Sequence, residues 1–499
     1  MATAYSNRKK IETILKREKG TIRKVFGTCP SVGICFPNSY YIGSSNLGFH
    51  FLYDRVNQRP DFLAERFFAD RIPALSLENL QPLNAFDIVM FSISFETDFA
   101  GVLQILKTAG LDFLRKDRKP DDPLIVCGGI AVTMNPLPLY DIADLLVLGD
   151  GEETLPVFLE TFLHTRGDKR ALLEEMNNRN GFLVPGKNSS DNISFQGKRA
   201  VCSNLDQHPL SSVYVTSETE FANTCLVEIS RGCPYHCSFC YVGYNQNPFR
   251  TRSLESIKGI IRHKRALTRR FGLISSAVNS HPEIFKICEW GVEQGLEMSF
   301  SSLRVDDISP RILEILAKSG QRTMTIAPET GSDSFRRSIN KSLTNRKMLE
   351  SSEAALKAGI RNLKLYFMLG LPGETRREIE ASVDLVKAIQ NICVPEWRKR
   401  KEMGEMAVSV SFFVPKPGTP FADYRFQEIG DLKKRQQFFQ AELKRTPHVK
   451  FHPANPHEAL AQAVLSQGGR ETSEILISKI NGLLSWKAAL KNLTPPKSP

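Results

Sequence analysis

The sequence predicts an α/β protein built from two parallel-sheet domains that follow one another along the chain. In two stretches, residues 30–165 and 223–425, short apolar runs alternate with longer amphipathic segments. Parallel strands that are buried on both faces read as continuous apolar runs, and helices usually form the crossovers between them. Glycine, serine and threonine follow many of these runs, at the carboxyl ends of the strands where ligands bind in such sheets. A chain of 499 residues is long enough for about two to four domains.

The first stretch predicts a doubly wound domain over residues 30–165, preceded by a basic helix within residues 1–29. Its strands are expected at 31–37, 86–94, 123–129 and 144–149, with helices over 46–53 and 99–106. Residues 166–222 are rich in turn-forming asparagine and are expected to connect the two domains.

The second stretch predicts a partial (β/α)₆ barrel over residues 223–425. Its strands are expected at 225–230, 271–276, 297–303, 323–327, 363–369 and 407–414, with helices over 254–269, 282–294, 310–319, 346–358 and 376–391. Six strands with crossover helices fit a partial barrel better than a closed eight-stranded one, and catalytic groups are expected at the carboxyl ends of the strands. Residues 426–499 predict a helical, basic tail with a disordered end at 493–499.

Composition limits the environment and the partners. The net charge of +12 and the pI of about 9.1 favour anionic partners such as nucleic acid, phospholipid or a phosphorylated substrate, although a solvated basic face is the commoner explanation. The sequence contains no run of eighteen apolar residues, so no transmembrane helix is expected. The N-terminus also lacks an apolar signal core, so a cytoplasmic protein is expected. Ten scattered cysteines do not predict a disulfide framework.

Three cysteines on one predicted loop carry the strongest chemical signal. Cys233, Cys237 and Cys240 form a C-x₃-C-x₂-C pattern, and clustered thiolates are how proteins hold iron–sulfur clusters. Three thiolates would leave one iron of a four-iron cubane without a protein ligand, and Phe239 would give the cluster an apolar wall. Zinc is the alternative, but it usually takes four ligands, and no fourth ligand stands at matching spacing. Cys202 and the other cysteines form no second ligand cluster along the sequence.

Polar residues and glycines end three of the later strands of the predicted barrel. Arg304 offers a guanidinium that can fork onto a carboxylate. Glu329 and Gly331 suit a ribose hydroxyl or an ammonium group. Gly370 and Gly373 form a turn that opens a helix, where backbone N–H groups meet polar ligands. The structural alternative is that the glycines serve only the turns and the charged groups form structural ion pairs.

The cysteine loop, together with Pro-Glu-Thr-Gly at 328–331 and Gly-Leu-Pro-Gly-Glu-Thr at 370–375, resembles the radical S-adenosylmethionine (SAM) superfamily. The resemblance implies a 4Fe–4S cluster whose open iron chelates the amino and carboxylate groups of SAM. It also implies an electron donor such as flavodoxin or ferredoxin, and a 5′-deoxyadenosyl radical that abstracts hydrogen from the substrate. A departure follows the second strand, where residues 275–281 replace the usual G-G-E-type motif. Asn279 or Ser276 could take over its role, and His281 could cap the next helix.

The first domain resembles the cobalamin-binding-type domain, Rossmann-like or flavodoxin-like, that precedes many radical SAM barrels. The likeness rests on the Gly-Gly loop at 128–129 and on Gly-Asp-Gly-Glu-Glu-Thr at 149–154. It implies a ligand crevice at the carboxyl ends of the strands. The residues expected in this crevice are Asn38, Ser39, Gly128, Gly129 and Gly151. The D-x-H-x-x-G signature that supplies a histidine to cobalt is absent, so either cobalamin binds without a histidine or the domain has lost the cofactor.

These features predict a radical SAM enzyme of an uncharacterised family with an unknown substrate. With cobalamin, the expected reaction is methyl transfer to an unactivated carbon. Without cobalamin, it would be a rearrangement, an oxidation or C–C bond formation. The alternative from another class is a non-catalytic iron–sulfur protein that binds RNA or senses redox state, although such a protein needs no SAM-like motifs. The lack of a second cysteine triplet argues against the methylthiotransferase type.

Overall fold

The computed structural model describes residues 2–71, 74–177, 179–186, 199–300, 304–305 and 308–483. The chain forms two compact units. Unit 1 comprises residues 1–225 and the segment that begins at Val464, and unit 2 comprises residues 226–463. The predicted strand end at 301–303 and the predicted disordered end at 493–499 lie outside the described residues. None of the described helices is long and apolar enough to cross a membrane.

Unit 1 contains a six-stranded sheet in the order β2-β1-β3-β4-β5-β6. Its strands are β1 (Ser31–Phe36), β2 (Leu63–Phe68), β3 (Ile88–Ser92), β4 (Leu124–Gly128), β5 (Leu145–Val147) and β6 (Phe182–Leu183). The first five strands pair in parallel, and β6 is antiparallel to β5. The order reverses direction between β1 and β3, which is the topological switch point of a doubly wound sheet. The predicted doubly wound fold is therefore confirmed, although β6 and the rest of unit 1 extend beyond the predicted bounds of 30–165.

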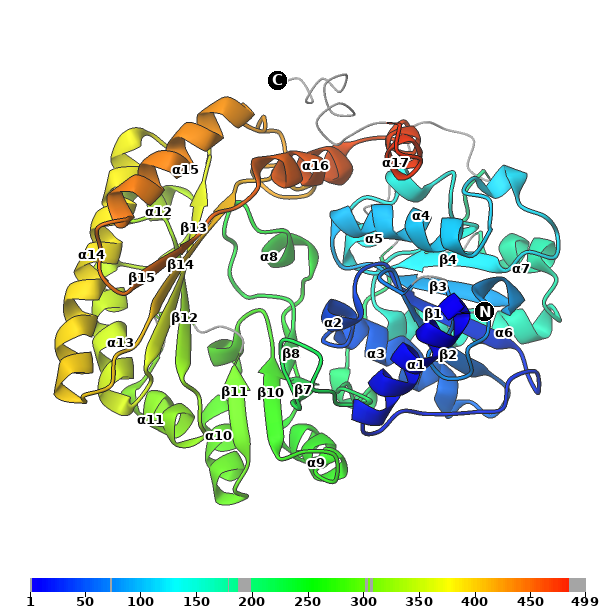
Figure 1. Cartoon of the computed structure of the whole chain (residues 1–499), viewed down its shortest axis with the longest axis horizontal. Coiled ribbons are helices and arrows are strands. Elements are labelled where there is room, and N and C mark those ends of the chain that lie inside the picture. The colour runs from blue at the N-terminus through cyan, green and yellow to red at the C-terminus, as the bar shows by residue number, and fades with distance from the viewer. Residues whose placement is uncertain are drawn as a thin grey trace. The chain divides into compact units, whose positions relative to one another are not determined.

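Helices cover both faces of this sheet (Figure 1). Val32, Ile34 and Phe36 of β1 belong to one core with residues of α3 (Leu47–Gln58) and α6 (Gly151–His164). Cys35 points to the opposite core, which includes residues of α4 (Phe99–Thr108), α5 (Ile130–Met134) and the late helix α17 (Thr472–Ile480). Every residue of β1, β2 and β3 is buried, so the faces of the sheet are closed to ligands.

Strand β2 was absent from the sequence prediction because charged residues interrupt its apolar run. Arg66, at its centre, is fully buried, and its guanidinium donates hydrogen bonds to Glu18 at 2.7 and 2.9 Å and to Glu78. The guanidinium carbon also lies 4.1 Å from the ring centroid of Tyr214 and 4.9 Å from that of Tyr53. Burial alone would lower the pKa of Arg66, but the two carboxylates raise it above its usual value. This buried charge cluster ties the segment after α1 (Ala2–Arg17) to the sheet.

Unit 2 contains the strands of a partial barrel. They are β7 (Cys225–Glu228), β10 (Arg270–Ile274), β11 (Glu297–Phe300), β12 (Thr323–Glu329), β13 (Asn362–Leu369), β14 (Met406–Phe412) and β15 (Val449–His452). The described strands pair as β11-β10-β7 and as β12-β13-β14-β15, and a short hairpin joins β8 (Ser230–Arg231) to β9 (Arg250–Thr251). All six predicted strands are present. The tail is helical as predicted, with α15 (Ile429–Leu443), α16 (Pro456–Gln467) and α17, but it also contains β15, which was not predicted.

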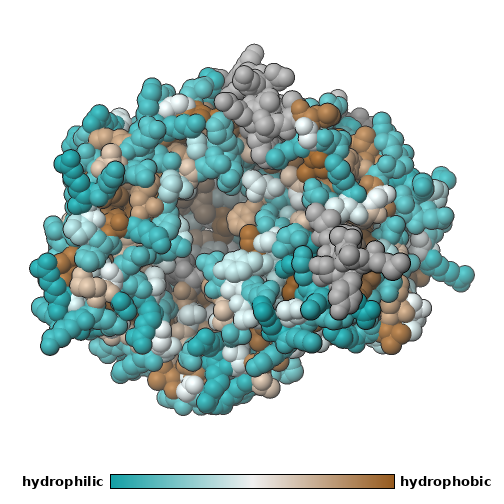
Figure 2. Space-filling view, viewed as in Figure 1, coloured by the Kyte–Doolittle hydropathy of each residue, from teal (hydrophilic) through white to brown (hydrophobic). Residues whose placement is uncertain are grey.

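Helices line the outer side of the barrel strands (Figure 1). They are α9 (Leu254–Lys264), α10 (Ile284–Glu293), α11 (Pro310–Lys318), α13 (Asn345–Ala358) and α14 (Arg376–Lys399). Along β13, buried residues such as Phe367 alternate with half-buried ones such as Tyr366. The ring centroid of Phe367 lies 5.4 Å from that of Phe439 in α15, so the buried face of the strand meets the helices. The other face borders the inner side of the barrel, and Figure 2 shows unit 2 hollowed beside α8 (Tyr241–Asn245).

Candidate functional site

The three cysteines lie on a short loop between β8 and α8. Gly232 opens the loop with a φ of 83°, and a Cβ there would come within 2.3 Å of the Gln246 carbonyl oxygen, so only glycine fits. Cys240 is the N-cap of α8, and its N–H donates to the Cys237 carbonyl at 2.9 Å. The Ser238 N–H donates to the Ile339 carbonyl, also at 2.9 Å. These bonds fix the loop at the carboxyl ends of the barrel strands.

A buried ion cluster supports the base of the loop. Glu228 at the end of β7 accepts hydrogen bonds from Arg231 at 2.8 Å and from Arg252 at 2.7 Å. Burial alone would raise the pKa of Glu228, but the two guanidinium groups outweigh it and hold the pKa below its usual value. His281 is buried beside this cluster, where its Nε2 contacts the Arg252 carbonyl at 2.8 Å and its Nδ1 accepts from the Glu283 N–H at 3.1 Å. His281 therefore braces the local backbone, but it is not the cap of the next helix, because the N-cap of α10 is Glu283.

The three cysteine thiols are not arranged to share a single metal ion. Their three sulfur atoms do not all lie within 4.8 Å of one another. In the described part of the chain, a different trio of potential ligands does meet this distance. Thiolates that bind separate irons of one cluster stand farther apart than ligands that share one ion. Burial raises the pKa of Cys233 and Cys237, and the nearby positive charges of Arg304 and Lys341 oppose this rise. Those charges favour the thiolate form that iron requires.

Arg304 is held beside the cysteine loop by two neighbours. Its guanidinium carbon lies 3.6 Å from the ring centroid of Tyr235, a loop residue that the sequence analysis did not single out. The side chain of Asn279 donates to the Arg304 carbonyl at 2.8 Å and accepts from the Arg304 N–H at 3.0 Å. Asn279 thus positions the backbone of Arg304. Its predicted role as a partner of the SAM amino group stays a prediction.

Glu329 ends β12 with a φ of 63°, a left-handed conformation that is uncommon for a residue other than glycine. Lys341, which follows the short helix α12 (Asp333–Ser338), forms an ion pair with Glu329 at 2.7 Å. Lys341 is not predictable from the sequence, because a lone lysine after a helix carries no motif. Strained backbone and a buried ion pair together hold the carboxylate of Glu329 at the strand end.

The predicted glycines mainly allow close packing. A Cβ on Gly331 would come within 2.0 Å of the Ala381 carbonyl oxygen in α14, and the Gly331 N–H donates to Ser382 at 2.7 Å. Gly370 and Gly373 have φ values of 84° and 80° in the turn before α14. The Gly370 N–H donates to the buried Glu374 carboxylate at 2.8 Å, and burial raises the pKa of Glu374 to about 7. Direct contact of these glycines with SAM stays a prediction.

Phe239 lies next to a small apolar cluster at the same strand ends. It is partly buried against Ile339, Leu371 and Phe413. This packing anchors the loop, and the role of Phe239 as an apolar wall beside the cluster stays a prediction.

The predicted cobalamin residues lie at the carboxyl ends of β1, β4 and β5, where most of them have structural partners. Asn38 donates to Asp98 at 2.9 Å, and Ser39 caps α2 (Tyr40–Gly43). A Cβ added to Gly129 would come within 2.3 Å of the Ile93 carbonyl oxygen, and a Cβ added to Gly151 would come within 2.9 Å of the Phe51 ring. At Gly128 it would lie 3.2 Å from the Val147 side chain, so a larger residue there would press on β5 rather than only fill a crevice.

Three exposed apolar side chains at this edge were missed by the sequence analysis. Tyr41 and Ile42 follow β1 and are 52% and 42% exposed, and Phe95 follows β3 and is 56% exposed. Strands β1 and β3 are neighbours that flank the switch point, where doubly wound sheets bind flat cofactors. In the sequence, these residues could have been found as apolar side chains that directly follow the turn at the end of a strand.

Two protein-family models match the chain. One, described as radical SAM proteins, N-terminal, matches residues 48–185, and one, described as the radical SAM superfamily, matches residues 227–386. The chain therefore belongs to the radical SAM superfamily. Membership implies a 4Fe–4S cluster and SAM as cofactors, and Cys233, Cys237 and Cys240 stay the residues predicted to hold the cluster.

Individual relatives agree with this assignment. An uncharacterised protein of Methanocaldococcus jannaschii is 27% identical over 450 residues, which cover 89% of this chain and 90% of that protein. A tRNA-2-methylthio-N(6)-dimethylallyladenosine synthase of Anaplasma phagocytophilum is 27% identical over 219 residues, 40% of this chain and 45% of the synthase. The solved structure of TsrM, a radical SAM methyltransferase from Kitasatospora setae, has a TM-score of 0.52 at 13% identity and covers 79% of this chain and 77% of TsrM. That likeness supports the fold.

Proposed function

We propose that this radical SAM protein is a cobalamin-dependent methyltransferase that acts on an unactivated carbon. The radical SAM activity is supported by the cysteine loop, because the charges of Arg304, Lys341 and Glu329 lie close enough to act on its thiols. The observation that favours cobalamin is the exposed apolar group at the switch point of unit 1.

The residues of unit 2 divide the work of SAM binding. The cluster, when bound to the three thiolates, supplies the electron that cleaves SAM to methionine and a 5′-deoxyadenosyl radical. The guanidinium of Arg304 can bind both oxygens of the SAM carboxylate, and the Tyr235 ring stacked against it holds the orientation of the guanidinium plane. Glu329, held by Lys341, can accept hydrogen bonds from the SAM ammonium or ribose. Phe239 and its apolar neighbours exclude water from the loop.

Assay of the SAM cleavage product tests the radical SAM part. Anaerobically reconstituted protein with a one-electron donor, such as dithionite, flavodoxin or ferredoxin, should bind about four irons and four sulfides and release 5′-deoxyadenosine from SAM. Cys237→Ala should lose both the brown chromophore and the product. Cys288→Ala, which changes a buried cysteine of α10, should keep both. A complete cluster in the Cys237→Ala protein would contradict the assignment, and a cluster without product would favour the non-catalytic alternative.

The cobalamin part rests on the shape and polarity of the switch point. The two faces of the sheet are buried, so a large ring must bind at the carboxyl edge, beside Tyr41, Ile42 and Phe95. His50, in the nearby helix α3, is buried, with Nε2 at 3.0 Å from the Ser44 carbonyl and Nδ1 accepting from the Val213 N–H. We therefore expect cobalt to bind without a histidine ligand.

Titration with hydroxocobalamin, followed by its visible spectrum, tests this part separately. Wild-type protein should bind at micromolar levels, and the Co(II) electron spin resonance should lack splitting by a protein nitrogen. Phe95→Ala should weaken binding roughly tenfold, since removal of one aromatic contact costs about 1.5 kcal/mol. Val25→Ala is the matched control, because Val25 is also exposed in unit 1, at 72%. If wild-type protein ignores saturating cobalamin but still makes 5′-deoxyadenosine, the enzyme is a cobalamin-independent one and the methyl-transfer proposal fails.

A further inference from the structure

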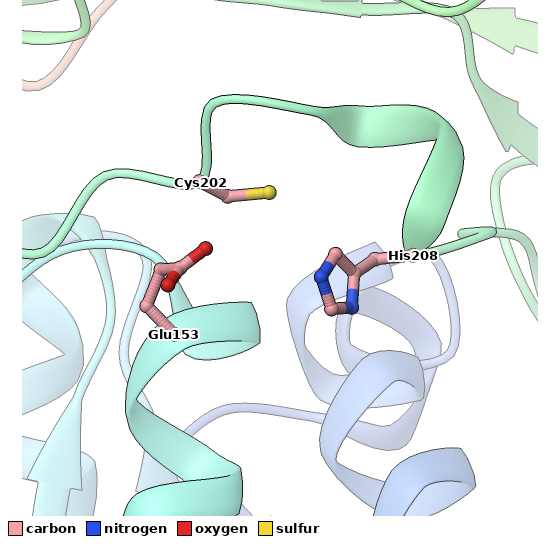
Figure 3. Close-up of side chains that lie close together, drawn as sticks. All are labelled: Glu153, Cys202 and His208. Atoms are coloured by element: carbon pink, nitrogen blue, oxygen red, sulfur yellow. The ribbon is translucent and has the colours of Figure 1, made fainter.

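Glu153, Cys202 and His208 of unit 1 converge on one point, and we propose that they bind a zinc ion. One oxygen of Glu153, the sulfur of Cys202 and one ring nitrogen of His208 all lie within 4.8 Å of one another. Figure 3 shows the three side chains directed toward a common space, from α6 on one side and from the connecting segment on the other. None of them belongs to the cysteine loop or to the strand ends that the radical reaction would use.

The fold brings these three residues together through a specific set of backbone contacts. Glu153 lies in the first turn of α6, directly after β5. The Asp150 N–H donates to the Ala200 carbonyl at 2.9 Å, and the Cys202 N–H donates to the Asp150 carboxylate at 2.9 Å. Gly149 permits this approach, because a Cβ there would come within 2.1 Å of the Ala200 carbonyl oxygen. The connecting segment is thereby fastened to the start of α6.

A short turn then returns the chain to the same point. The 3₁₀ helix η5 (Leu205–Gln207) begins at Asn204, whose side chain accepts from the Asp206 N–H at 3.1 Å. His208 is the C-cap of this helix, so its ring comes back beside Cys202. The placement of all three ligands thus follows from ordered backbone and not from chance contacts of long surface side chains.

The donor set matches the chemistry of zinc. Thiolate, imidazole and carboxylate are its usual protein ligands, at about 2.0–2.3 Å from the ion. Ligand atoms on one zinc ion are therefore less than about 4.6 Å apart, which small side-chain rotations reach from the observed separation. A thiolate and a carboxylate balance the two positive charges of the ion. Binding would release the thiol proton of Cys202 to solvent and break its weak contact with the Asn204 carbonyl at 3.5 Å.

Burial suggests how the site would be used. Cys202 is 1% exposed, His208 is half-buried and Glu153 is exposed, so solvent reaches the carboxylate side of the trio. Three protein ligands leave the fourth position of a tetrahedral zinc ion to water. The ion would also cross-link the connecting segment to α6, which should stabilise unit 1 by mass action.

Zinc binding can be measured in the full-length chain without interference from the iron site. In a background in which Cys233, Cys237 and Cys240 are alanine, zinc sulfate is titrated against a chromophoric chelator. One zinc per chain should bind. Loss of a residue that only hydrogen-bonds to a metal ligand weakens metal affinity roughly 10–100-fold. Cys202→Ser and His208→Ala each remove a direct ligand, so each should weaken zinc binding by more than that. Cys29→Ser, which changes a half-buried thiol of unit 1, should leave the affinity unchanged.

Two further measurements test the same three ligands. X-ray absorption of the zinc-loaded protein should show one sulfur at about 2.3 Å, and this scattering should vanish in Cys202→Ser. If Cys202→Ser fails to fold, Glu153→Gln serves instead, since Glu153 is exposed and its loss should weaken binding at least tenfold. The proposal is wrong if the parent background binds no zinc, or if it binds zinc equally well after changes at positions 202, 208 and 153.

Discussion

The sheet of unit 1 and the four-stranded sheet of unit 2 bury their strands in different ways. Every residue of β1, β2 and β3 is buried. In β12, β13 and β14, buried residues alternate with residues that are half-buried or exposed. The cause is the layer arrangement, because helices cover both faces of the first sheet and the outer face of the second. The first sheet can therefore offer a ligand only its edge, whereas the second also offers an inner face.

The inner face of the second sheet is polar where the strands are in register. Lys364 of β13 is opposite Thr325 of β12 and Ala407 of β14, and Tyr366 is opposite Ser409. Small and polar residues on this face do not fill it as Val, Ile and Leu would. We expect the substrate of the radical reaction to lie against it.

The largest effect on stability is expected at the buried charge cluster of unit 1. Arg66→Leu would leave the carboxylates of Glu18 and Glu78 buried without their partner, at a cost of about 3–5 kcal/mol in the free energy of unfolding. Denaturant unfolding of unit 1 measures this. Arg8→Leu breaks only an exposed pair with Glu12 and should cost less than about 0.5 kcal/mol. A loss below about 1 kcal/mol in Arg66→Leu would contradict the stabilising role of the cluster.

Matched substitutions on the two sheets test the comparison directly. Ile34→Ala in β1 removes a fully buried side chain and should cost about 2–5 kcal/mol. Thr325→Ala, on the inner face of β12, should stay within about 0.5 kcal/mol. Equal costs at the two sites would show that the inner face of the barrel is filled and cannot receive a substrate.

The strand ends of unit 2 should matter for SAM affinity. Loss of a charge-assisted hydrogen bond costs about 1.5–3 kcal/mol, so Glu329→Ala should weaken SAM binding roughly ten- to a hundredfold. Isothermal titration of the reconstituted protein measures the affinity, and Glu353→Ala, in an exposed pair on α13, is the control. Unchanged affinity in both Glu329→Ala and Arg304→Ala would move the SAM pocket elsewhere.

The smallest expected effect is the contribution of Glu18 to the pH dependence of stability. Burial would raise the pKa of Glu18, but Arg66 and the surrounding hydrogen-bond donors hold it below its usual value of 4.5. A carboxyl group with a lowered pKa contributes stability above the pKa of the unfolded state and loses that contribution as the pH falls toward its folded pKa. Stability should therefore decline below about pH 4.5, and Glu18→Gln should flatten this decline. An identical slope in wild type and Glu18→Gln would contradict the pKa assignment.

The sequence predicted what local pattern determines and missed what tertiary contacts determine. Apolar runs located the strands, and the spacing of Cys233, Cys237 and Cys240 located the candidate cluster. Strand β2 escaped because Glu65 and Arg66 look like surface charges until Glu18 and Glu78 are seen beside them. Partners such as Lys341 and Tyr235 come from turns whose sequence carries no motif.

The zinc trio shows the same limit most clearly. Glu153 belongs to the Gly-Asp-Gly-Glu-Glu-Thr turn, far along the chain from Cys202 and His208. No ligand spacing connects them, and only the contact between residues 148–150 and 200–202 brings them together.

The segment from Val464 through α17 completes the first unit. Leu465 and Leu476 are fully buried in the core beneath α4, and Asn135 donates hydrogen bonds at 2.9 Å to the carbonyls of Leu465 and Gly468. During synthesis, the N-terminal unit must therefore wait with part of its apolar core uncovered until the ribosome has made unit 2 and the segment that follows it. Such a nascent chain would be exposed to aggregation and to chaperones for the time needed to translate the barrel. A premature stop anywhere in the barrel would damage both units.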